Sequence, residues 1–320
     1  MKNNFNEIYN DSLNKPEEFW KNISQDVFWF KKPSKILNRN NPPFFKWFED
    51  GITNSCYNAL DLHIDQGRGD KTALIYDSPI TGNKSKFTFK ELKQKVSRFA
   101  GALDKQGVKK GDRVIIYMPM IPEAVIAMLA CGRIGAIHSV VFGGFASNEL
   151  ASRIDDSKAK VLITASCGFE PGRVVEYRPL VDNALKLANH KIEKVILYQR
   201  KDHEVKLNEP LEVSWDESLV NAIDKDCVEM GANDLAYILY TSGTTGVPKG
   251  IVRDIGGHIV ALKWTMKNIY NIDTDDIWWS ASDIGWIVGH SYIVYAPLFK
   301  GCTTVLFEGK PVGTPDAGAF

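Results

Sequence analysis

A short stretch from Thr241 to Gly250, TSGTTGVPKG, combines hydroxyl groups, glycines and one lysine. It directly follows an apolar run, LAYILY, at residues 235–240, which is typical of a buried strand. Glycines let a backbone turn sharply and bring its N–H groups close to an anion, hydroxyls add rotatable donors, and Lys249 supplies a point charge. The stretch therefore predicts a phosphate-binding loop at the end of a strand.

Two other interpretations of this loop are weaker. A Walker A loop needs a glycine five residues after its first glycine, and Pro248 stands at that place after Gly243. This disfavours a P-loop kinase or GTPase. An ordinary surface loop explains the glycines and threonines, but it does not explain an ordered pattern directly after a buried strand.

Composition limits the classes of function. The chain has 320 residues, of which 44% are hydrophobic and 24% charged, as in globular proteins. Its 39 basic and 39 acidic residues balance, which disfavours nucleic acid or an anionic membrane as a partner. The longest apolar stretch, residues 124–142, is interrupted by Arg133 and His138, so we expect no membrane span.

The cysteines and the N-terminus bear on the compartment. The five cysteines are odd in number, far apart and without a Cys-x-x-Cys pair, which argues against a disulfide framework and a zinc site. The first residues have no apolar core of a secretory signal, and their early acids do not suit a transit peptide. We therefore expect an intracellular protein, in the mitochondrial matrix or the cytoplasm.

From about residue 86 the sequence alternates between helical and strand patterns. Phe89–Leu103 has apolar residues at helical spacing, and Pro122 with Glu123 begins a helix that extends to about Gly135. Further helices are expected at 147–157 and 179–189, and strands at 113–118, 138–142, 160–164 and 194–198. This order predicts an α/β fold, with a mostly parallel sheet flanked by helices, whose ligands bind beyond the carboxyl ends of the strands.

Residues 1–65 differ from the rest because they are rich in aromatic residues and asparagine. We interpret them as an N-terminal cap whose aromatic rings fill grooves on the main body. Base stacking on a basic surface is the weaker alternative, because the lysines of this region alternate with acids. The predicted organisation is a cap at 1–65 and a large domain at 66–320.

The 241–250 loop resembles the phosphate-loop signature of the adenylate-forming enzymes, which include acyl-CoA synthetases, luciferases and peptide synthetase adenylation domains. The stretches SDIGWIVGHSY at 282–292 and VFGGF at 141–145 are similar to the short-chain branch with acetyl-CoA and propionyl-CoA synthetases. ASCGFEPGR at 165–173, Arg253-Asp254 and EGKPVGTPD at 308–316 resemble the propionyl-type members. Acetyl-type enzymes usually carry a second arginine where Glu170 stands here.

The resemblance implies a reaction in two steps. A short-chain carboxylate and MgATP give an acyl-adenylate with release of pyrophosphate, and coenzyme A then displaces AMP. Lys249 and Thr244 are the implied catalytic residues, and ATP phosphates are assigned to Thr241, Ser242, Gly243, Thr244, Thr245, Gly246 and Lys249. Arg173, Gly143 and Gly144 are assigned to coenzyme A.

The same resemblance assigns the acyl pocket to Trp286, Ile287 and Val288, and it favours propionate, with acetate or butyrate as alternatives. Without it, Trp286 is read as a packing residue. His290 remains open between a site residue and a structural one.

Members of the family are about twice as long as this chain. The segments for adenine, ribose, the Mg²⁺ ligand and a bridging lysine are expected beyond Phe320, so the chain alone is expected to be inactive. The alternative from another class is a truncated nucleotide-binding protein of the same fold, and a luciferase-like oxidase is weaker still. The expected partners are therefore small molecules, and the oligomeric state stays open.

Overall fold

The computed structural model describes residues 5–241, 248–310, 313–316 and 318. Its main sheet has seven strands, and every neighbouring pair is parallel except the last, β14–β15. In spatial order the strands are β12 (Glu212–Ser214), β11 (Lys194–Tyr198), β8 (Val161–Ala165), β6 (Arg113–Tyr117), β7 (Ile137–Val140), β14 (Leu235–Thr241) and β15 (Lys249–Asp254). The predicted mostly parallel sheet is confirmed.

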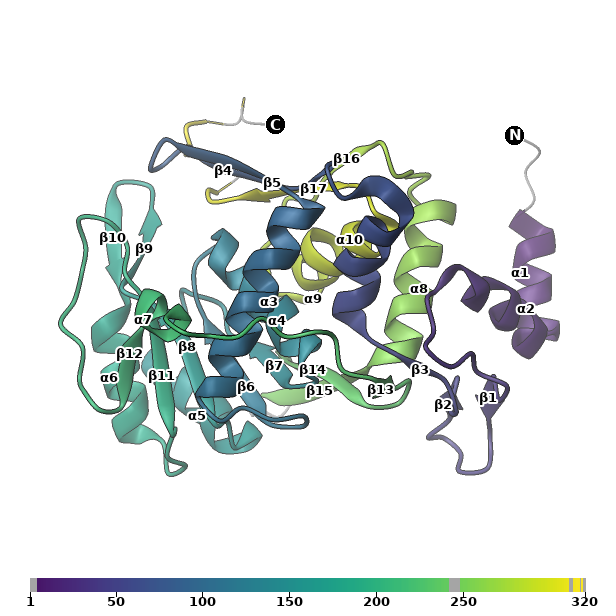
Figure 1. Cartoon of the computed structure of the whole chain (residues 1–320), viewed down its shortest axis with the longest axis horizontal. Coiled ribbons are helices and arrows are strands. Elements are labelled where there is room, and N and C mark those ends of the chain that lie inside the picture. The colour runs from purple at the N-terminus through teal and green to yellow at the C-terminus, as the bar shows by residue number, and fades with distance from the viewer. Residues whose placement is uncertain (1–4, 242–247, 311–312, 317, 319–320) are drawn as a thin grey trace.

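Helices cover both faces of this sheet. They include α3 (Phe89–Lys105), α4 (Pro122–Arg133), α5 (Ser147–Ser157) and α6 (Tyr177–Leu187). The chain passes from β6 through α4 to β7, and then through α5 back to β8 on the other side of β6. Right-handed crossovers in opposite directions put α4 and α5 on opposite faces. Accordingly α3 packs with α4, and α5 packs with α6 (Figure 1).

A second sheet, which the sequence patterns did not predict, has four strands. They are β16 (Ile277–Trp279), β17 (Thr303–Phe307), β4 (Thr72–Ser78) and β5 (Asn83–Thr88). β17 pairs in parallel with both β16 and β4, whereas β4 and β5 form an antiparallel hairpin. The sheet thus joins two segments from the early part of the chain to two from its last fifth.

The N-terminal segment lies at one end of the molecule. Its helices α1 (Phe5–Asn14) and α2 (Pro16–Ile23) stand beside α8 (Ile255–Asn268), opposite the β9–β10 hairpin (Cys167–Glu170 and Arg173–Glu176) (Figure 1). Trp29 and Phe48 are buried, and the ring of Trp20 packs edge-on against Trp264 of α8. Part of the aromatic set therefore packs as the cap interpretation expects, although Phe44 remains 74% exposed.

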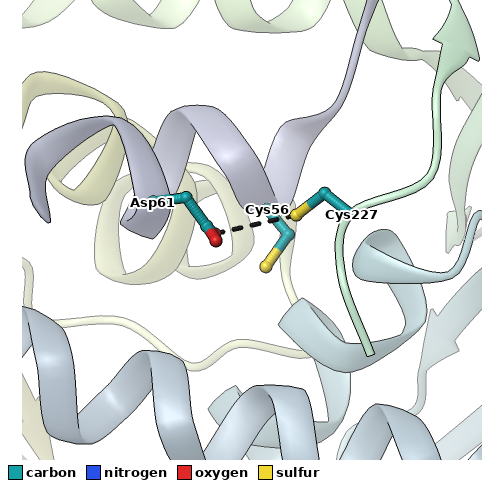
Figure 2. Close-up of side chains that lie close together, drawn as sticks. All are labelled: Cys56, Asp61 and Cys227. Atoms are coloured by element: carbon teal, nitrogen blue, oxygen red, sulfur yellow. Dashed lines mark hydrogen bonds between the residues drawn. The ribbon is translucent and has the colours of Figure 1, made fainter. Parts of the chain in front are cut away.

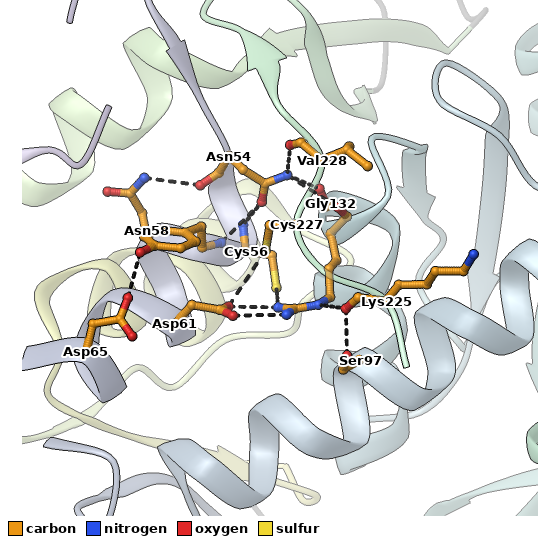
Figure 3. A network of polar contacts seen from close by, with 12 residues as sticks. Asn54, Cys56, Asn58, Asp61, Asp65, Ser97, Gly132, Lys225, Cys227 and Val228 are labelled. Carbon is orange, nitrogen blue, oxygen red and sulfur yellow. Dashed lines mark hydrogen bonds and ion pairs between the residues drawn. The ribbon is translucent and has the colours of Figure 1, made fainter. Parts of the chain in front are cut away.

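A polar network fixes residues 54–61 to the main domain (Figure 3). Asn54 Nδ2 donates to the carbonyls of Gly132 and Val228, at 2.9 Å each. The guanidinium of Arg133 donates to both carboxylate oxygens of Asp61, at 2.7 and 2.9 Å. Arg133 is fully buried, so this bidentate pair satisfies a charge that would otherwise be very costly to bury.

The remaining elements include β1 (Leu37–Asn38), β2 (Lys46–Trp47), β3 (Ile52–Thr53), α7 (Trp215–Leu219), β13 (Met230–Gly231), α9 (Ile287–Gly289) and α10 (Ala296–Lys300). Among the described residues, no helix has both the length and the apolar character needed to cross a membrane.

Two helical glycines offer a matched test of packing. A Cβ at Gly101 in α3 would lie 1.9 Å from the backbone oxygen of Ile223, whereas a Cβ at Gly132 in α4 would meet nothing closer than 4.0 Å. Segment 222–225 cannot easily withdraw, because Lys225 N–H donates to Ser97 O. We therefore expect Gly101→Ala to destabilise the protein by about 1–3 kcal/mol despite the better helix propensity of alanine.

Gly132→Ala is the control, and it should be neutral or stabilising by up to about 1 kcal/mol. Urea denaturation of the two variants beside the parent measures both effects. A Gly101→Ala protein as stable as the parent would contradict the close packing of α3 against segment 222–225.

Candidate active site

A cavity of about 360 Å³ lies at the carboxyl edge of the main sheet. Three of its walls follow strands of that sheet: residues 119–120 after β6, 142–144 after β7 and 168–170 after β8. The second sheet supplies the opposite wall, at residues 279–283 from the end of β16 onward and 307–310 from the end of β17 onward. The cavity thus lies between the two sheets.

The position of the cavity follows from the order of the strands. After β6 the chain first turns to β7 on one side and later to β8 on the other. The loops at the ends of these strands diverge there and leave a crevice, which is where open α/β sheets bind their ligands. The expected place of binding, beyond the carboxyl ends of the strands, therefore coincides with a real cavity.

The predicted phosphate loop begins and ends at the same edge. β14 runs parallel to β7, so its carboxyl end points the same way, and β15 returns antiparallel with Thr241 opposite Lys249. Both residues are exposed. The other predicted phosphate-binding residues, Ser242, Gly243, Thr244, Thr245 and Gly246, lie outside the described residues.

Arg173 and Glu170 face each other across the β9–β10 hairpin. Arg173 Nε donates to Glu170 Oε2 at 2.7 Å, and Lys310 Nζ lies 2.9 Å from Oε1 of the same carboxylate. The hydrogen bonds and charges of Lys310 and Arg173 outweigh burial and hold the pKa of Glu170 below its usual value. Arg173 and Glu170 of the hairpin and Lys310 from the segment after β17 thus form a cluster of two cations and one carboxylate, with one net positive charge beside the cavity.

Gly143 and Gly144, the predicted coenzyme A contacts, line the cavity. A Cβ at Gly143 would lie 2.1 Å from the hydroxyl of Tyr177, and a Cβ at Gly144 would lie 2.7 Å from the ring of Phe142. The buried Tyr177 therefore gives position 143 a packing reason to be glycine, in addition to any contact with a ligand.

The three predicted acyl-pocket residues differ in position. Trp286 lines the cavity and packs near Phe142 and Phe145, with ring centroids 5.8 and 5.9 Å away. It is 48% exposed, so the alternative that it is a core residue is wrong. Ile287 and Val288, at the start of α9, are 46% and 52% exposed and are not among the described residues that line this cavity.

His290, which the sequence left open, is a buried structural residue. Its Nδ1 lies 3.1 Å from the carbonyl oxygen of Ile284, and its Nε2 lies 3.1 Å from Nε2 of His138. Burial, only partly offset by the Ile284 carbonyl, lowers the pKa of His290 to about 4. The side chain is therefore neutral at physiological pH and inside the core.

The sequence reasoning gave no role to Asp283, whose side chain is in the cavity wall. Burial raises the pKa of this carboxyl to about 6, although the Gly285 N–H donates to Oδ1 at 2.7 Å and acts in the opposite direction. An acid inside the SDIGW stretch was the available signal, because perturbed carboxyls in clefts are frequent at functional sites.

A second missed feature is a buried ion pair that joins the two sheets. Arg200, just after β11, donates to both oxygens of Glu308, just after β17, at 2.8 and 3.2 Å. The hydroxyl of Tyr76 in β4 also donates to Glu308, and the guanidinium lies 4.6 Å from the ring centroid of Phe169. Glu308 lines the cavity, so this pair forms part of its wall.

Comparison with known proteins gives two family matches. The family described as "AMP-binding enzyme" matches residues 63–319, and the one described as "Acetyl-coenzyme A synthetase N-terminus" matches residues 5–59.

Similar proteins include human "Acyl-CoA synthetase short-chain family member 3, mitochondrial", 55% identical over 97% of this chain and 45% of the relative. "Acetyl-coenzyme A synthetase" of Xylella fastidiosa is 44% identical over 95% of this chain and 48% of the relative. The solved structure of acetoacetyl-CoA synthetase from Streptomyces lividans aligns with a TM-score of 0.90 at 25% identity, over 99% of this chain and 48% of that one.

The chain spans about half the length of the curated relatives that it matches. The family match covers most of the chain, and the structural alignment confirms the predicted α/β fold. The resemblance to short-chain acyl-CoA synthetases, first indicated by the motifs, is confirmed as well. We conclude that the chain belongs to the AMP-binding enzyme family.

Proposed function

We propose that this chain is part of a ligase that converts a short-chain carboxylic acid, propionate in preference to acetate, into its acyl-CoA with release of AMP and pyrophosphate. The observation that carries the proposal is the meeting of the cavity and the β14–β15 hairpin at one edge of the sheet. An acid-binding cavity and a phosphate-binding loop at this edge suit a reaction between a carboxylate and ATP.

In the first half-reaction the carboxylate attacks the α-phosphorus of ATP, and negative charge builds on the departing pyrophosphate. The backbone N–H groups and hydroxyls of residues 241–246, together with Lys249, would stabilise that charge. Mg²⁺ would supply further neutralisation of the phosphates.

In the second half-reaction the thiol of coenzyme A attacks the acyl carbon and AMP leaves. Arg173 is suited to the phosphates of coenzyme A, because a guanidinium presents a fork of donors and this side chain is 69% exposed. The carboxylate of Glu170 neutralises one of the two positive charges of Arg173 and Lys310. The cluster therefore presents one net positive charge to a phosphate.

The proposed organisation keeps residues 1–65 as the cap and residues 66–320 as the large domain. The proposed compartment is the mitochondrial matrix or the cytoplasm, and the name of the similar human protein, which includes "mitochondrial", favours the former.

Lys249→Ala, made in the full protein, is expected to slow adenylate formation by about 100-fold or more while leaving thioester formation from supplied acyl-adenylate nearly unchanged. The reason is that Lys249 would face pyrophosphate, which has left before coenzyme A attacks. Pyrophosphate exchange and single-turnover thioester synthesis measure the two steps, and Lys267→Ala, on the exposed end of α8, is the control. Equal losses in both steps would reject the role.

Val288→Trp and Ile287→Trp are expected to shift the preference from propionate toward acetate, because the larger ring would fill the acyl pocket. One methylene is worth about 1–3 kcal/mol in such pockets, so a shift of about tenfold or more in the ratio of kcat/KM is expected. Val220→Trp, at a position 57% exposed elsewhere on the surface, is the control. If folded variants keep the parent ratio, these two residues do not line the pocket.

Asp283→Asn is expected to change the pH dependence of stability. The folded-state pKa of Asp283, about 6, lies above the ordinary value of 3.8, so between these values the folded protein binds more protons than the unfolded chain. The stability of the parent relative to Asp283→Asn should therefore fall as the pH rises from about 4 to about 6, and level off above about 7.

Denaturation midpoints of parent and variant across this pH range measure the difference, with Asp202→Asn in an exposed turn as the control. A difference that does not change with pH would mean that the pKa of Asp283 is not raised in the folded protein.

A further inference from the structure

Two cysteines that are distant in the sequence lie side by side in the fold. Cys56 precedes the helical segment 57–61, and Cys227 lies in the segment that connects α7 to β13. Their sulfur atoms and a carboxylate oxygen of Asp61 all lie within 4.8 Å of one another (Figure 2). Both cysteines are free thiols. Because the two cysteines are far apart in the sequence, their spacing gave no sign of this contact.

Arg133 gives this pair an unusual electrostatic setting. Its Nη1 lies 3.5 Å from Cys56 Sγ, and the same guanidinium holds both oxygens of Asp61. A buried cation beside a thiol favours the thiolate. Burial acts to raise the pKa of the Cys56 thiol, but the hydrogen bond from Cys227 and the charge of Arg133 outweigh it and leave that pKa below its ordinary value.

The pKa of the Cys227 thiol is shifted in the opposite direction. Burial and the nearby Cys56 and Asp61 raise the pKa of the Cys227 thiol, so it keeps its proton. It is nevertheless partly exposed, whereas Cys56 is fully buried. Cys56 is therefore the residue disposed to be the nucleophile, and a small reagent would reach it from the side of its partly exposed neighbour Cys227.

A divalent metal fits this cluster poorly. Within the described residues it offers three ligand atoms, and the carboxylate among them is already held at both oxygens by Arg133. The side chain of Arg133 is fully buried, so the cation cannot withdraw, and it would repel a metal ion placed beside it. The cluster suits an anionic sulfur and its oxidation better than a metal.

We propose that Cys56 and Cys227 form a redox modification site, in which a hydroperoxide oxidises the two thiols to a disulfide. The Cys56 thiolate attacks one peroxide oxygen, the O–O bond breaks, and with hydrogen peroxide as the oxidant a sulfenic acid and a hydroxide ion form. The hydroxide takes up the proton that the Cys56 thiol released on ionising and becomes water. The sulfur of Cys227 then attacks the sulfenic sulfur, its proton leaves with the hydroxyl as a second water, and the S–S bond forms. Two thiols lose two electrons, and the peroxide is reduced to two molecules of water.

The neighbouring backbone positions both partners for this step. The carbonyl of Lys225 accepts hydrogen bonds from Ser97 Oγ and Arg133 Nε, and Val228 N–H donates to the carbonyl of Arg133. Segment 225–228 is thus held against α3 and α4, while Cys56 N–H donates to Asn54 Oδ1 on the other side. The sulfurs need only approach from within 4.8 Å to the bonding distance of about 2.05 Å.

The test is to map the thiols of the full protein. The reduced protein is treated with hydrogen peroxide, remaining thiols are alkylated, and a non-reducing digest is analysed by mass spectrometry. The expected result is a linked peptide pair containing Cys56 and Cys227, about 2 Da lighter than the separate peptides, which a dithiol reductant restores. Cys302→Ala, a buried cysteine that donates only to a backbone carbonyl, is the control and should keep the link.

Cys227→Ser should abolish the link and leave Cys56 as a sulfenic or sulfinic acid, and this substitution on a partly exposed segment avoids emptying the core. Thermal unfolding adds a second readout, because the disulfide should raise the melting temperature of the parent and not that of Cys227→Ser. Failure to form the linked pair in folded protein, or independent oxidation of each cysteine, would overturn the proposal. Stoichiometric binding of Zn²⁺ that protects both thiols would overturn it in favour of a metal site.

Discussion

The ion pair between Arg200 and Glu308 fixes the distance between the two sheets, and the cavity depends on it. Arg200 follows a strand of the main sheet, and Glu308 follows a strand of the second. Both side chains are buried, with 6% and 3% exposure, so neither charge can be left without its partner. Two hydrogen bonds, the hydroxyl of Tyr76 and the ring of Phe169 satisfy them. Since Glu308 lines the cavity, sliding one sheet along the other would break the pair and deform the site.

The parts of the fold that were predicted are those whose signal is local. Strands β6, β8 and β11 are nearly continuous apolar runs, and the helices between them have helical spacing, so their order was sufficient to predict the parallel sheet. The second sheet could not be predicted in this way. β5 has the sequence NKSKFT, which is largely polar and partly exposed. Its partner β4 pairs on the other side with β17, which lies more than two hundred positions away in the sequence. Nothing in either segment identifies the other.

The residues of the candidate site also divide into those with a local signal in the sequence and those whose roles depend on distant contacts. The glycine and hydroxyl loop was predicted from residue types alone, and it stays a prediction because residues 242–247 lie outside the described residues. Trp286 was assigned to the acyl pocket through the resemblance, and it does line the cavity. Ile287 and Val288 follow Trp286 directly and are about as exposed as it is, but they do not line this cavity, since the chain turns into α9 at Ile287. Asp283 and Glu308 were missed because their importance lies in burial and in distant partners, and a single sequence displays neither.

Two buried arginines show how the chain encodes such long-range contacts. Arg133 brings Asp61 and the segment of Lys225 to α4, and Arg200 brings Glu308 and Tyr76 to the end of β11. Hydrophobic contacts tolerate many partners of similar size, whereas a buried guanidinium requires acceptors at a few fixed directions. Each arginine thus selects one arrangement of its neighbours among many that would bury similar apolar area. Arg200 thereby holds Glu308 in the wall of the cavity, and Arg133 holds together the segments that carry Cys56 and Cys227.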